Sequence, residues 1–231
     1  LATTTKDHAL AHPWVLILGV SSGFGAAAAK AYAEAGYHVA GVHLDRSSTL
    51  ANAHELQASI EATGQRCVFF NGNAADDTKR GEVISALGEH ISSTGGELRV
   101  LLHSLAFGSL LPFIPTETQR ALSAKQMTMT LEVMGHSLVW WTRDLVSANL
   151  LGAKGRVFAM TSTGSTSAFH AYGAVGAAKA CLESHVRYLA MELAERQITV
   201  NAVLAGVTDT PALRKIPGAE DLLEAALKRN P

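Results

Sequence analysis

Charge is scarce and balanced in this sequence of 231 residues. Charged side chains make up 17% of it, and 19 Lys and Arg nearly cancel 20 Asp and Glu, for a formal net charge of −1. A surface that binds nucleic acid or anionic lipid carries a marked positive excess, which this chain lacks. No apolar run approaches the ~18–20 residues that a membrane-spanning helix needs. We therefore expect no nucleic-acid partner and no membrane partner.

Cysteine is almost absent. Cys67 and Cys181 lie far apart and match no motif of a metal site or a disulfide framework. So few thiols suit a reducing compartment, and we expect a cytoplasmic protein. Of the ten histidines, His8 and His12 have helical spacing, but they lie in a polar stretch before Pro13 with no third ligand in sequence. We therefore predict no metal site.

Hydrophobic residues, at 48%, are plentiful enough for a substantial core in one domain. They form short β-type runs that alternate with longer stretches of helical spacing. The short runs are residues 14–18, 38–43, 67–71, 99–104, 156–162 and 199–203. The helical stretches are residues 23–35, 49–63, 77–93, 117–149 and 172–195.

This alternation predicts βαβ units around a parallel sheet with helices on both faces. We expect a single doubly wound α/β domain, a three-layer αβα Rossmann fold, over residues 14–231. Residues 1–13 are expected to form an N-terminal arm.

A glycine-rich loop, Gly19-Val20-Ser21-Ser22-Gly23-Phe24-Gly25, joins the first expected strand to the first expected helix. Glycines let such a turn approach a pyrophosphate, and the N–H groups at the helix start hold the anion. The spacing is GxxxGxG rather than the commoner GxGxxG, so a simple tight turn is the alternative. The residues predicted to bind a dinucleotide are Gly19, Ser21, Ser22, Gly23, Phe24 and Gly25.

Cofactor choice depends on two neighbours after the second expected strand, Asp45 and Arg46. An acid here accepts hydrogen bonds from the adenosine ribose and repels a 2′-phosphate, whereas an arginine binds that phosphate. NADH, marginally favoured by Asp45, and NADPH therefore both remain open. Asn73, after the third strand, is a candidate contact for the adenine edge.

A candidate proton-transfer group, Ser162, Tyr172 and Lys179, follows the fifth expected strand. Tyr172 and Lys179 are seven residues apart, which places them within about 20° on one face of a helix. A tyrosine of ordinary pKa, ~10, needs a nearby positive charge to transfer protons at neutral pH. Lys179 would supply that charge, and Ser162 a hydroxyl beside the reacting oxygen. By spacing alone, a surface tyrosine and a solvated lysine are the alternative.

Together these motifs resemble the short-chain dehydrogenase/reductase superfamily over nearly the whole chain. The resemblance is carried by Gly19-x-x-x-Gly23-x-Gly25, Ser162, Tyr172, Lys179, Val200-Asn201-Ala202-Val203 and Gly206-Val207-Thr208-Asp209-Thr210. The six residues between Tyr172 and Lys179, and His103-Ser104-Leu105-Ala106-Phe107, resemble the branch of the enoyl-acyl-carrier-protein reductases. The segment from Thr208 to Glu224 is most similar to the type III enzymes of that branch.

The resemblance implies that Tyr172 stabilises or protonates the substrate oxygen, while Lys179 holds the nicotinamide ribose. It implies further cofactor contacts by Ser104 and Thr210. His103 would contact the ribose or the backbone rather than act as an acid or base. The substrate site would be lined by Ala106, Phe107, His170 and Tyr172.

Two departures leave the reaction open. Ser162 stands where the better-known enoyl reductases carry a second tyrosine, and Glu132 stands where the superfamily usually has asparagine. We expect an NAD(P)H-dependent oxidoreductase that reduces the C=C bond of an enoyl thioester in fatty acid biosynthesis. The alternatives are a carbonyl or 3-oxoacyl reductase or alcohol dehydrogenase, and a non-catalytic NAD(P)-binding sensor.

The expected partners are a small-molecule or carrier-bound acyl thioester and further copies of the chain, in a homotetramer or homodimer. Residues 208–230 are expected to form a lid over the acyl chain. The superfamily normally adds a seventh strand after this lid, and we expect this chain, which ends at Pro231, to lack it.

Overall fold

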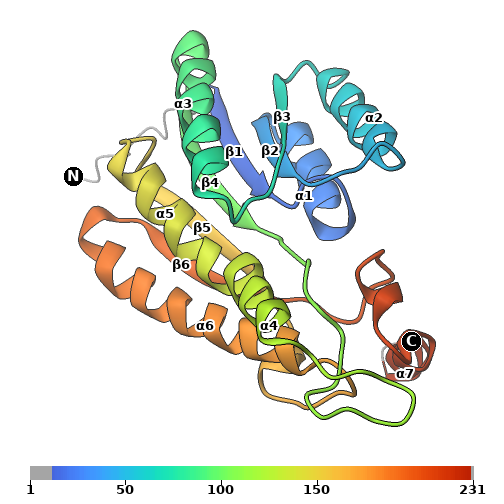
Figure 1. Ribbon diagram of the computed structural model, residues 1–231. Helices are drawn as coiled ribbons and strands as arrows, with labels where there is room; N and C mark the ends of the chain where they lie inside the picture. The colour runs from blue at the N-terminus through green and yellow to red at the C-terminus, as the bar shows by residue number, and fades with distance from the viewer. Residues whose placement is uncertain (1–11, 230–231) are drawn as a thin grey trace.

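Six parallel strands form one sheet in the order β3-β2-β1-β4-β5-β6, as seen in Figure 1. The structure is a computed structural model that describes residues 12–229. The strands are β1 (Pro13–Leu18), β2 (His38–His43), β3 (Cys67–Asn71), β4 (Glu97–His103), β5 (Leu151–Thr161) and β6 (Thr199–Leu204).

Alternate residues of β1 pack into two separate cores, one on each face of the sheet. Trp14, Leu16 and Leu18 join the core under α3 (Asp77–Thr94), α5 (Ser137–Ser147) and α6 (Gly173–Leu193). Val15 and Ile17 join the core under α1 (Gly23–Glu34) and α2 (Leu50–Glu61). Because successive side chains of a strand point to opposite faces, the all-apolar run is explained by helices on both sides. The expected three-layer αβα fold is confirmed.

The prediction of one continuous helix over residues 117–149 is wrong in two respects: the helix begins later, and a π-helical turn interrupts it. Residues 104–123 form a long loop, in which the Leu122 N–H donates to the Pro112 carbonyl. Helix α4 (Ala124–Leu131) begins only after Ser123, which forms a capping box with Gln126. A π-helical turn, η1 (Glu132–His136), then leads into α5.

Strand β5 begins five residues before the expected start, at Leu151, because Leu151 pairs with Leu98 across a register irregularity. After β6, the chain forms a 3₁₀ turn, η4 (Leu213–Lys215), and then α7 (Ala219–Arg229). No residue of α7 is buried, and the helix lies on the side of the sheet where the strands end (Figure 1).

The expected arm lies outside the described residues except for His12 and Pro13, and Pro13 already belongs to β1. The absence of a seventh strand stays a prediction. Among residues 12–229, no helix combines the length and the hydrophobicity that a bilayer crossing requires.

Candidate active site

The glycine loop is wound tightly at the carboxyl end of β1. Gly19 has a φ of +87°, and a Cβ there would lie 2.5 Å from the Ser104 carbonyl oxygen. A Cβ on Gly25 would overlap the Gly19 carbonyl oxygen. Both positions therefore require glycine, and the loop presents bare backbone where the sequence predicted a phosphate contact.

The start of α1 suits an anion. Ser22 is the N-cap residue, yet its side chain caps no N–H group, and no acidic residue lies in the first turn. The N–H groups of this turn and the positive end of the helix dipole are therefore left for a ligand. Thr210 lies over the loop, since a Cβ built on Gly23 would be 3.6 Å from its side chain. Ser104 and Thr210, both predicted cofactor residues, are thus brought to the glycine loop.

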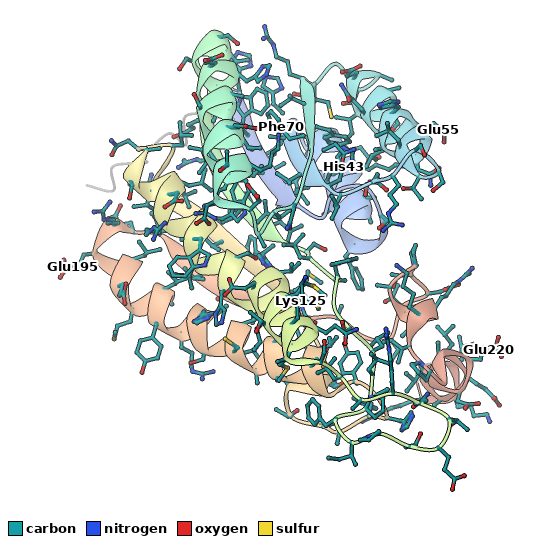
Figure 2. The ribbon with its side chains drawn as sticks, viewed as in Figure 1. His43, Glu55, Phe70, Lys125, Glu195 and Glu220 are labelled. Atoms are coloured by element: carbon teal, nitrogen blue, oxygen red, sulfur yellow. The ribbon has the colours of Figure 1, made fainter. Side chains whose placement is uncertain are left out.

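Asp45 is held in place at the end of β2. His43 Nδ1 lies 2.8 Å from Asp45 Oδ2, and Figure 2 labels His43 on that strand. Burial acts to raise the pKa of Asp45, but hydrogen bonds to Ser21, Thr49 and His43 outweigh it, so the pKa lies below its usual value. A carboxylate fixed in this way can accept hydrogen bonds from ribose hydroxyls, which makes the site fit a dinucleotide.

A residue that the sequence did not single out, Asn71, also fixes Asp45. Asn71 Oδ1 accepts the Asp45 N–H at 3.1 Å, and Asn71 Nδ2 donates to the Asp45 carbonyl at 2.9 Å. The sequence signal that could have identified Asn71 is its position at the end of β3, the strand next to β2. Arg46 is exposed, and exposed Asn73 accepts the Ala75 N–H at 3.0 Å, so the adenine contact of Asn73 stays a prediction.

The two candidate hydroxyl groups meet. Ser162 Oγ, just after β5, lies 3.3 Å from the hydroxyl oxygen of Tyr172, which is the residue before α6. A Cβ on Gly164 would overlap the Tyr172 ring, so the loop backbone passes directly against that ring. The loop therefore fixes where the tyrosine hydroxyl points.

Lys179 is buried between the ends of β4 and β5. Its Nζ donates to the Met160 carbonyl at 2.7 Å and lies 3.4 Å from the Leu105 carbonyl. Burial lowers the pKa of Lys179 to about 8, against a smaller opposing effect of the Glu183 charge. The two carbonyl partners orient the ammonium group, which sequence spacing could not predict.

The ribose contact predicted for His103 is wrong, because its ring is fully buried and faces α5. His103 Nε2 lies 2.8 Å from Ser137 Oγ, whose own proton goes to the Val133 carbonyl. Nε2 must then donate, and Nδ1 has no partner within the described chain. Burial, and secondarily the Lys179 charge, lower the pKa of His103 to about 3, so the ring is neutral.

Two loops meet beside Tyr172 to form the mouth of the site. The Phe113 ring lies against Gly173, and His170 Nε2 lies 3.3 Å from Gln119 Oε1. The predicted substrate residues Ala106, Phe107 and His170 are exposed on these loops. Further large apolar side chains exposed here are Phe113, Ile114 and Phe169.

Comparison with known proteins identifies the family of the chain. The family model described as Enoyl-(Acyl carrier protein) reductase matches residues 19–231. The NADH-dependent enoyl-[acyl-carrier-protein] reductase of Aquifex aeolicus is 30% identical over 155 residues, 67% of this chain and 56% of that protein. The NADPH-dependent enzyme of Staphylococcus aureus is 30% identical over 159 residues, 64% of this chain and 58% of that protein. These matches therefore span little more than half of either relative.

A longer match is the 1-cyclohexenylcarbonyl-CoA reductase of Streptomyces collinus, 28% identical over 221 residues, 94% of this chain and 72% of that protein. Among solved structures, the Aquifex aeolicus enoyl reductase superimposes with a TM-score of 0.75 and 26% identity, covering 96% of this chain and 83% of that one. The chain therefore belongs to the enoyl-(acyl-carrier-protein) reductase family of the short-chain dehydrogenase/reductase superfamily of oxidoreductases.

Proposed function

We propose that this protein is an NAD(P)H-dependent reductase of the C=C bond of an enoyl thioester. The observation that carries the proposal is the Ser162–Tyr172 hydroxyl pair, which is 3.3 Å apart and lies beside an apolar mouth. Lys179 is buried within α6, seven residues after Tyr172. The relatives support the proposal, since their names give an enoyl-acyl-carrier protein or a cyclohexenylcarbonyl-CoA as substrate. Both are unsaturated acyl thioesters.

The cofactor would be held by the features at the ends of β1 and β2. Gly19 and Val20 use their N–H groups on the Val42 carbonyl, so the N–H groups at the α1 start would bind the diphosphate. Asp45 would bind the adenosine ribose. When bound, a reduced nicotinamide dinucleotide supplies the hydride for reduction of the β-carbon. NADH is marginally favoured, because the ionised and well-fixed Asp45 repels a 2′-phosphate, and exposed Arg46 leaves NADPH open.

The chain's own contribution is to stabilise negative charge on the thioester oxygen as the C=C bond is reduced. The Tyr172 hydroxyl would donate a hydrogen bond or its proton to that oxygen, and Ser162 Oγ would hold the Tyr172 hydroxyl. Lys179 places an ammonium group inside the site, and its positive charge favours release of the proton from the Tyr172 hydroxyl. The exposed side chains of Phe107, Phe113 and Phe169 would bind the acyl chain.

Carbonyl reduction is the second candidate, because the serine–tyrosine pair is equally suited to protonate a developing alkoxide. The test is oxidation of NADH and of NADPH by the full chain with a crotonyl thioester or an acetoacetyl thioester. We expect faster turnover with the crotonyl thioester. Faster turnover with the acetoacetyl thioester would establish carbonyl reduction, and no turnover with either would favour a non-catalytic sensor.

A role in fatty acid biosynthesis would follow if a carrier-bound thioester is preferred to the coenzyme A thioester, and the same assay compares the two. The homotetramer or homodimer and the cytoplasmic location stay predictions.

A further inference from the structure

Three ligand-type side chains converge between η1 and α6, away from the candidate active site. His136 Nδ1 lies 3.0 Å from His185 Nε2, and Cys181 Sγ lies 3.1 Å from His185 Nε2. Cys181 Sγ lies 3.7 Å from His136 Nδ1, which closes the triangle. The three atoms all lie within 4.8 Å of one another, so they face a common point.

Local structure builds this convergence. Cys181 and His185 are four residues apart on α6, which places them on one face of the helix. His136 is the last residue of the π-helical turn η1, a kind of irregularity often found at functional sites. A Cβ on neighbouring Gly135 would lie 3.3 Å from the Ala178 carbonyl oxygen and 3.5 Å from Cys181 Sγ. Glycine there lets η1 lie close enough to α6 for His136 to reach Cys181.

The spacing of the three atoms is that of a tetrahedral metal site. With Zn–N bonds of about 2.0–2.1 Å and Zn–S bonds of about 2.3 Å, tetrahedral angles separate two nitrogens by about 3.3 Å and a nitrogen from a sulfur by about 3.6 Å. The separations here are 3.0 Å between the nitrogens, and 3.1 and 3.7 Å from nitrogen to sulfur. Movements of a few tenths of an ångström would bring all three atoms to bonding distance from one ion.

We propose that His136, Cys181 and His185 form a zinc site with three protein ligands. Sulfur and imidazole ligands favour zinc over magnesium or calcium, which prefer oxygen. Both histidines line a surface groove, together with Glu132, Trp140 and Tyr188, from which water would supply the fourth ligand. Zinc with one thiolate carries a net charge of +1, and the Glu132 carboxylate in the same groove would balance it.

The consequence for the fold is a cross-link between η1 and α6. Cys181 follows Lys179 by two residues on α6, so the ion would stabilise the helix that carries Lys179 without entering the active site. The sequence predicted no metal site because His136 and Cys181 are 45 residues apart, and only the Cys-x-x-x-His pair on α6 could have signalled it.

The test is titration of the purified, metal-free chain with Co²⁺, whose visible absorption is intense in a tetrahedral site and whose near-ultraviolet charge-transfer band reports a bound thiolate. We expect one equivalent to bind and both signals to be abolished in Cys181→Ser and in His185→Ala. Cys67→Ser and His54→Ala are the matched controls and should keep both signals, since neither residue belongs to the cluster. No tetrahedral signal in the unaltered chain, or an undiminished thiolate band in Cys181→Ser, would overturn the proposal.

Thermal unfolding gives a second readout that does not depend on activity. A hundredfold excess of Zn²⁺ over its Kd should raise the Tm of the unaltered chain by about 5–10 °C. The metal-free variants should unfold cooperatively, with the Tm shift lost in Cys181→Ser and kept in Cys67→Ser. An equal Tm shift in Cys181→Ser would contradict the site even if that variant were less stable.

Discussion

The Ser162 hydroxyl lies 3.3 Å from the Tyr172 hydroxyl, although the two residues are ten positions apart in the chain. Ser162 follows β5 and therefore lies at the carboxyl edge of the sheet. A short loop then reverses the chain and brings Tyr172, the residue before α6, next to Ser162. Ser162 and Tyr172 are both half-buried residues, so the pair is both positioned and reachable. Proton transfer needs both properties.

Replacing Tyr172 by phenylalanine removes only the hydroxyl and should lower kcat with a crotonyl thioester by about 10²–10⁴-fold. The Kd for NADH or NADPH should change little, because the glycine loop and Asp45 are untouched. Steady-state kinetics and cofactor fluorescence titration check the two parts. Tyr188→Phe, on the exposed face of the same helix, is the control and should keep full activity. Unchanged turnover in Tyr172→Phe would rule out this mechanism.

Replacing Ser162 by alanine separates the two candidate reactions. If Tyr172 alone serves the substrate oxygen, Ser162 contributes one orienting hydrogen bond, and its loss should cost up to about tenfold in kcat. If Ser162 binds the reacting oxygen directly, as carbonyl reduction would require, the loss should be about 10²–10³-fold. Ser167→Ala, an exposed serine in the same loop, is the matched control. We expect the smaller loss with a crotonyl thioester.

The buried ammonium group of Lys179 predicts a pH dependence of stability. Its pKa in the folded chain is lowered from 10.5 to about 8, so between these pH values the unfolded chain binds more protons. The free energy of unfolding should therefore rise with pH across this window, and Lys179→Met should lack that increment. Denaturant unfolding at pH 8 and at pH 10 measures it. Lys125→Met, at the exposed start of α4 (Figure 2), should retain the increment.

The lowered pKa of Lys179 also predicts a pH dependence of activity. If the ammonium form supports Tyr172, kcat should fall as the pH rises through about 8. A profile that stays flat to pH 10 would show that the charge of Lys179 is not used.

Asp45 and Arg46 predict opposite effects on the two cofactors. Asp45→Ala should raise the KM for NADH by about tenfold, through lost ribose hydrogen bonds, and lower the KM for NADPH by removing a repulsive charge. Arg46→Ala should raise the KM for NADPH alone. If each substitution changed both KM values equally, neither residue would distinguish the 2′-hydroxyl of NADH from the 2′-phosphate of NADPH.

Short-range patterns predicted much of this molecule, and contacts between distant residues account for what they missed. The apolar run at residues 14–18 predicted a buried central strand, and Trp14 to Leu18 indeed pack on both faces. Residues 117–122 have a helical pattern, but the Leu122–Pro112 hydrogen bond and the cap at Ser123 delay the helix. His103 lies at the end of a strand, yet its ring is buried and contacts Ser137, 34 residues later. The sequence alone contains no measure of such packing.

The contact between Gly164 and the Tyr172 ring gives a prediction about a residue with no chemistry of its own. A Cβ on Gly164 would overlap the ring, so Gly164→Ala must displace either the loop or the tyrosine. Because a displacement of about 1 Å in catalytic geometry can cost about 10²-fold in rate, kcat should fall by that order while the Kd of the cofactor is kept. Gly81→Ala in α3, where a Cβ meets nothing within 4 Å, is the matched control. Equal kcat values for the two variants would show that the loop does not position Tyr172.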